Sequence, residues 1–139
     1  MQEVISPRKP ARDRPVPAGL LYGLRILVVA QAVGLIAAAS FAGQAVRGGE
    51  ALAETHVLAG MVVHLIALLQ IVVAVMVWRP GRGAGWPALA SVGLFLVGMA
   101  QHFSWEALGT HVPSGLALFG MTVAVLVWAW SSGAAVRRS

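Results

Sequence analysis

Residues 55–78 read THVLAGMVVHLIALLQIVVAVMVW and contain no Asp, Glu, Lys or Arg. An α-helix needs about 20 mostly apolar residues to cross the hydrocarbon core of a bilayer, which is roughly 30 Å thick. This stretch has that length and that composition, so it predicts a transmembrane helix.

Three similar apolar segments flank it, at residues 19–45, 86–103 and 110–130. The linkers between the segments are short, at residues 46–54, 79–85 and 104–109. Short linkers make consecutive helices antiparallel neighbours, and the segments lack the alternating pattern of barrel strands. The sequence therefore predicts an all-α fold, an integral membrane four-helix up-and-down bundle.

Composition supports this fold class. Apolar residues make up 58% of the 139 positions and charged residues 11%, whereas soluble domains carry about 25% charge. There is no cysteine, which excludes disulfides, iron–sulfur ligation and covalent attachment of a c-type haem. The length predicts one domain, at residues 19–131.

The two ends of the chain are polar. Residues 1–18 hold four Pro and four basic residues, which predicts a disordered basic cytoplasmic tail. Residues 132–139 are expected to form a second cytoplasmic tail.

Charge is distributed unevenly between the two expected membrane surfaces. The basic residues of one side are Arg8, Lys9, Arg12, Arg14, Arg79, Arg82, Arg137 and Arg138, and Arg25 can reach toward it. The other side carries Arg47 with Glu50, Glu54 and Glu106. Because Lys and Arg accumulate in cytoplasmic loops, we expect both termini on the cytoplasmic side of a bacterial inner membrane.

A short motif occurs twice. Residues 55–60 read THVLAG and residues 110–115 read THVPSG, so four of six positions match. Each copy opens one of the apolar segments. The repeat predicts that the bundle is built from two repeated helical hairpins, related by an axis along the membrane normal.

The repeat places His56 and His111 at the same expected depth, on helices that are diagonal in a four-helix bundle. Two imidazoles facing each other across the core can hold a haem iron, and we expect one haem b there. Gly60 and Gly115 follow one turn deeper on the same faces, where they would leave room for the porphyrin. The alternative is that both histidines only pack or form interhelical hydrogen bonds.

The other two histidines have less defined expectations. His64 lies about 12 Å deeper than His56 along the helix, and we expect no other histidine at its depth. It could bond to a propionate, a quinone or a water, or be a satisfied core histidine. His102 is expected at the outer interface. Polar and small residues should face the bundle interior, among them Gln31, Gly34, Ala38, Gln70, Ser91, Gly98, Gln101 and Thr122.

A metal site is a further alternative, because Glu54, His56, His102, Glu106 and His111 could cluster at the outer surface and suit zinc or copper. Catalytic motifs are absent from the sequence: there is no carboxylate pair within the apolar segments and no phosphate-binding loop. We therefore expect no independent catalytic activity.

Residues 20–131 resemble one four-helix half of heme A synthase, a family of two tandem bundles with histidines on the second and fourth helices of each. The resemblance implies His56 and His111 as haem ligands, with Glu54 as the counterpart of an acidic residue before the first histidine. The spacing of Glu54 differs from that family, and the second bundle is missing. The chain also resembles an uncharacterised group of small four-span bacterial membrane proteins.

The leading hypothesis is a small b-type cytochrome-like protein that serves electron transfer or a haem-linked step within a membrane complex. The alternative is a non-catalytic accessory subunit of a respiratory or photosynthetic complex. A small transporter also fits the length, but the apolar segments carry no acid for proton coupling. Expected partners are membrane lipid and either membrane-protein subunits or further copies of the chain; no nucleic acid is expected.

Overall fold

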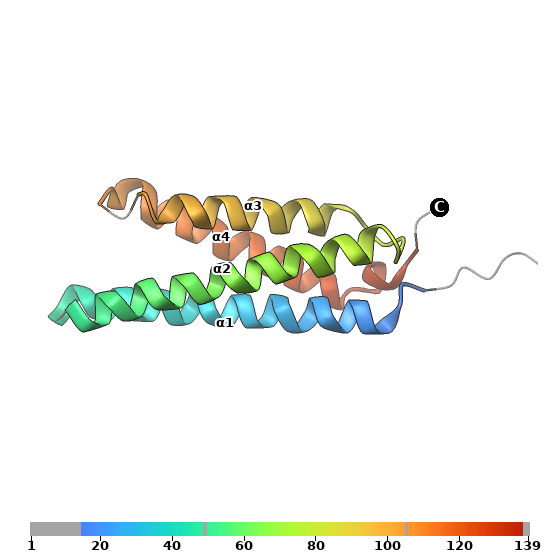
Figure 1. Cartoon of the computed structure of the whole chain (residues 1–139), viewed down its shortest axis with the longest axis horizontal. Coiled ribbons are helices and arrows are strands. Elements are labelled where there is room, and N and C mark those ends of the chain that lie inside the picture. Colours follow the sequence, from blue (N-terminus) through green and yellow to red (C-terminus); the bar gives the residue numbers. More distant parts are fainter. Residues whose placement is uncertain (1–14, 49, 105, 138–139) are drawn as a thin grey trace, which may run out of the picture.

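The computed structural model describes residues 15–48, 50–104 and 106–137. Its four α-helices are α1 (Ala18–Gly48), α2 (Glu50–Trp78), α3 (Trp86–Gln101) and α4 (Leu108–Trp130), followed by a short 3-10 helix, η1 (Ser132–Ala135). The helices run up and down in one elongated bundle (Figure 1). The predicted all-α membrane bundle is confirmed.

The bundle consists of two hairpins, α1–α2 and α3–α4. Within the ring, α2 also packs against α3 and α4 against α1, so α2 and α4 are diagonal. The start of α1, the short helix η1 and the α2–α3 connection lie at one end, here called the termini end (Figure 1). The α1–α2 and α3–α4 connections lie at the opposite end, the loop end, where the two hairpins diverge (Figure 1).

Three helices, α1, α2 and α4, are long and apolar enough to cross a membrane. The fourth is shorter than predicted. α3 ends at Gln101, and the N–H of His102 bonds to the carbonyls of Met99 and Ala100, which begins a tight turn. With 16 residues α3 is about 24 Å long, less than the roughly 30 Å hydrocarbon core.

The other helices exceed their predicted bounds. α1 continues to Gly48 and α2 begins at Glu50, so most of the expected linker at residues 46–54 is helical. Arg, Ala and Glu favour helix formation in water as well as in protein, so the helices continue beyond the apolar segments. The predicted connection at residues 79–85 is non-helical, as expected.

The hydrophobic core lies at the termini end. It consists of Val16, Leu24, Val28, Ala74, Val77, Ala88 and Val125. The N–H of Val16 donates to the carbonyl of Ala135, which ties η1 to the segment preceding α1. Residues 1–14 of the expected N-terminal tail lie outside the described residues.

Four of the polar side chains expected in the interior are buried. Gln31, Gln70, Ser91 and Thr122 are each at most 1% exposed. The Gln70 Nε2 donates to Ser91 Oγ over 3.0 Å and so joins the two hairpins. Large apolar side chains on the outer faces are exposed, as expected of a surface in contact with lipid.

Candidate functional site

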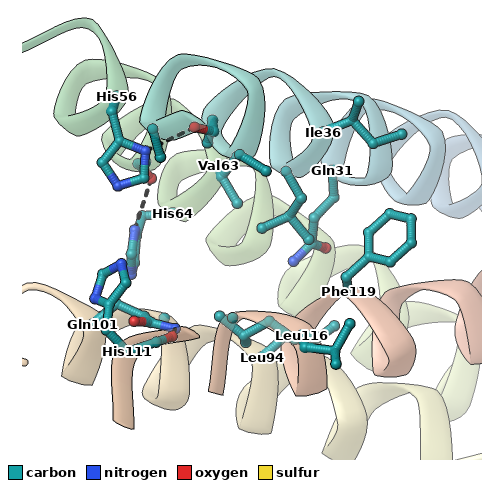
Figure 2. A pocket seen from close by; sticks show the side chains of 18 of the residues that line it. Gln31, Ile36, His56, Val63, His64, Leu94, Gln101, His111, Leu116 and Phe119 are labelled. Atoms are coloured by element: carbon teal, nitrogen blue, oxygen red, sulfur yellow. Dashed lines mark hydrogen bonds between the residues drawn. The ribbon is translucent and has the colours of Figure 1, made fainter. Parts of the chain in front are cut away.

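A cavity of about 710 Å³ lies at the loop end between the two hairpins. All four helices line it, and Figure 2 shows its side chains pointing inward from α1 and α2 on one side and from α3 and α4 on the other. Small-molecule and cofactor sites usually measure about 300–1,000 Å³ and are mostly apolar. The lining is apolar except for a few polar side chains, which include all four histidines.

His56 and His111 face each other across this cavity. Their ring centroids are 6.1 Å apart and the ring planes meet at 60°. The two residues come from α2 and α4, the diagonal helices, so the pair spans the bundle (Figure 2). The structure thus brings together the two histidines that the repeat singles out.

This separation fits a metal held by both rings. When two imidazoles bind one metal from opposite sides, each ring nitrogen lies about 2 Å from it, which places the ring centroids about 6 Å apart. From the two rings the cavity extends toward Gln31, Leu94 and Phe119 (Figure 2). The ring separation and the mostly apolar lining are compatible with a haem held by both histidines.

A main-chain hydrogen bond fixes the orientation of His56. Its Nδ1 lies 2.8 Å from the carbonyl oxygen of Ala38. A carbonyl only accepts, so Nδ1 carries the proton and Nε2 keeps its lone pair for a ligand. Such a bond to the second ring nitrogen is the usual support of a metal-bound histidine. Ala38 contributes through its backbone, which its residue type in the sequence does not reveal.

His111 is held differently. Its Nδ1 is buried without a hydrogen-bond partner among the described residues, so the ring is not fixed by its own nitrogen. Its backbone carbonyl instead accepts from Gln101 Nε2 over 3.2 Å, and the same nitrogen donates to Ser114 Oγ over 3.1 Å. Gln101 thereby ties the end of α3 to the start of α4.

The expectation that His64 has no histidine neighbour is wrong. The rings of His64 and His102 lie 4.7 Å apart at an angle of 37°. The His102 ring lies beside the third and fourth turns of α2, near Gly60 and His64, and the residue remains exposed. His64 Nδ1 donates to the carbonyl of Gly60, and its Nε2 is buried without a partner among the described residues.

Gly60 and Gly115 both line the cavity. A Cβ added at Gly60 would meet its nearest atom, in His102, at 4.0 Å, and one at Gly115 would meet Gln101 at 3.4 Å. An added Cβ would make ordinary van der Waals contact at both positions, and their role toward a porphyrin remains a prediction. Gly98 has no room for a side chain, since an added Cβ would lie 2.9 Å from His64 Nε2.

The alternative metal cluster does not form in the described part of the chain, where no three His, Cys, Asp or Glu side chains come close enough to share a metal ion. Glu54 and Glu106 are exposed, and neither is among the residues that line the cavity. The metal-binding donors that line the cavity are the ring nitrogens of two histidine pairs, His56 with His111 and His64 with His102.

Comparison with known proteins found no matching family, no matching curated protein and no matching solved structure.

Proposed function

We propose that the chain binds one haem b between His56 and His111 and acts as a small membrane cytochrome of the b type. The observation that carries this proposal is the 6.1 Å separation of the two rings, from diagonal helices, across an apolar cavity of about 710 Å³. A haem held by two histidines supplies one-electron redox chemistry.

The protein's own residues have distinct roles in this proposal. His56 and His111 hold the iron, and the Ala38 carbonyl keeps His56 in the tautomer that leaves Nε2 free. The apolar lining excludes water from the macrocycle. The resemblance of residues 20–131 to one half of heme A synthase points to the same two ligands.

The test is a visible spectrum of the purified protein after expression with sufficient haem. We expect the reduced protein to show the α-band of a six-coordinate b-type haem, and His56→Ala or His111→Ala to abolish it. His64→Ala and His102→Ala are matched controls, because both side chains line the same cavity. Both variants should keep the band, and His64→Ala should at most shift its potential. A colourless wild-type protein would refute the proposal and favour the accessory-subunit hypothesis.

We infer that the termini end faces the cytoplasm of a bacterial inner membrane. Arg25, Arg79, Arg82 and Arg137 lie at that end, whereas Glu50, Glu54 and Glu106 lie at the loop end. Cysteines introduced at positions 6 and 139 should resist an impermeant thiol reagent in intact cells, and one at position 48 should react. Labelling of the termini would reverse this orientation.

We further propose that the chain works with membrane-protein subunits or with copies of itself. Exposed apolar side chains cover the outer faces of all four helices and suit either lipid or another subunit. Purification in mild detergent should recover a homo-oligomer or a co-purifying membrane protein. A monomer with full redox activity in liposomes would contradict this proposal.

A further inference from the structure

A second hollow lies on the outside of the bundle near the termini end. It measures about 390 Å³ and is lined by Tyr22, Arg25, Ile26, Val29 and Ala30 of α1 and by Trp130 of α4. Apart from Arg25 and the polar edges of the two aromatic rings, its surface is aliphatic. This groove is separate from the histidine cavity and does not depend on the proposed haem.

Arg25 is held in place at this groove. Its Nε donates to the carbonyl of Ala129 over 2.8 Å. The guanidinium carbon lies 5.3 Å from the ring centroid of Tyr22 and 5.3 Å from that of Trp130, both within cation–π range. The side chain therefore has a fixed position between two aromatic rings of the kind found at membrane boundaries.

Most of the hydrogen-bonding capacity of Arg25 is unused. A guanidinium has five N–H donors, and only the Nε–H has a partner within the described residues. The remaining four belong to the two terminal nitrogens, which form the fork that matches a phosphate or carboxylate.

The described part of the chain offers this cation no counter-charge. Its three acidic residues, Glu50, Glu54 and Glu106, all lie at the loop end. Arg25 lies in the second turn of α1, about 10 Å from the start of the helix, where an unneutralised charge is costly. An anion that pairs with Arg25 therefore comes from outside the described residues.

We propose that this groove binds an anionic phospholipid, with the headgroup phosphate on Arg25 and an acyl chain along Ile26, Val29 and Ala30. A net negative lipid is favoured over a zwitterionic one because the other described charges at this end, Arg79, Arg82 and Arg137, are also positive. They attract a net negative headgroup and repel the ammonium of phosphatidylcholine.

Native mass spectrometry of the full chain in mild detergent tests the proposal, with phosphatidylglycerol and phosphatidylcholine as probes. We expect retained phosphatidylglycerol in the wild type and at least tenfold weaker retention in Arg25→Gln, since a bidentate charge-assisted contact is lost. Arg25→Lys should restore part of it. Arg79→Gln is the control for net charge alone: it removes one positive charge at the same end, 4.6 Å from the Trp78 ring but outside the groove, and should lower retention much less than Arg25→Gln does.

A second variant tests the acyl-chain half of the site with Arg25 intact. Val29 is 42% exposed, so Val29→Trp should fold and fill the groove, and lipid retention should fall. Equal retention of both lipids, displacement of the lipid by excess inorganic phosphate, or unchanged retention in Arg25→Gln would each overturn the proposal.

Discussion

The hairpin α1–α2 and the hairpin α3–α4 open their second helices with the same THV sequence, but they differ in length and in the way they hold its histidine. The first hairpin has helices of 31 and 29 residues, and the second of 16 and 23. In the first, the backbone of the partner helix fixes the His56 ring. In the second, Gln101 fixes only the backbone of His111. Matching residues therefore reach matching positions through different contacts.

The first hairpin depends on one close approach between its helices. A Cβ added at Gly34 of α1 would lie 2.7 Å from Val63 Cγ2 of α2. We expect Gly34→Ala to lower the free energy of unfolding by about 1–3 kcal/mol, because the overlap forces the helices apart. Thermal unfolding in detergent, followed by circular dichroism, measures this change.

Gly93→Ala in the second hairpin is the matched control, because no atom lies within 4 Å of its added Cβ. Its stability should be unchanged or slightly raised. The double variant Gly34→Ala with Val63→Ala should regain part of the loss. Equal effects at Gly34 and Gly93 would mean that close packing does not distinguish the two hairpins.

Gln101 should matter more than Gln44, the glutamine near the end of α1. Gln101→Leu removes two hydrogen bonds between α3 and α4, which we expect to cost about 1 kcal/mol. With haem bound as proposed, the variant should also broaden the haem band by loosening His111. Gln44 is exposed and bonds only within α1, so Gln44→Leu should leave stability and spectrum as in the wild type.

A smaller effect is expected where the two hairpins meet. Ser91→Ala removes the partner of Gln70 Nε2, and interhelical hydrogen bonds in membrane proteins average about 0.6 kcal/mol. Thr55→Val is the control, since the Thr55 hydroxyl bonds only within α2. Unfolding in a denaturing detergent, compared between the two variants, should show a loss for Ser91→Ala alone. An equal loss of stability in Thr55→Val would mean that the interhelical bond of Ser91 contributes no more than a bond within one helix.

Much of the fold could be predicted because polar residues are rare in this chain. Gln31, Gln70, Ser91 and Thr122 interrupt apolar runs, and lipid offers them no partners, so they mark the interior. The helix ends could not be predicted in the same way. Hydropathy locates the boundary of the bilayer, whereas Arg47 and Glu50 continue the helices beyond it.

The candidate site was only partly predictable for a related reason. The repeat identified His56 and His111, and a diagonal pair follows from short linkers alone. The proximity of His64 and His102 depends on how α2 and α3 are staggered along the bundle, and an apolar run does not indicate that stagger. The Ala38 carbonyl is a main-chain group, so its role required coordinates.

The position of the core at the termini end has a mechanical consequence. The two hairpins are clamped together near Val28, Val77 and Val125, and they diverge toward the loop end, where the cavity lies (Figure 1). The bundle is thus closed at the termini end and open at the loop end. A molecule bound in the cavity contacts both hairpins far from the core about which they would rotate. It therefore restrains that rotation more effectively than an equal contact beside the core. Binding of a molecule in the loop-end cavity would therefore determine how rigidly the two hairpins are held together.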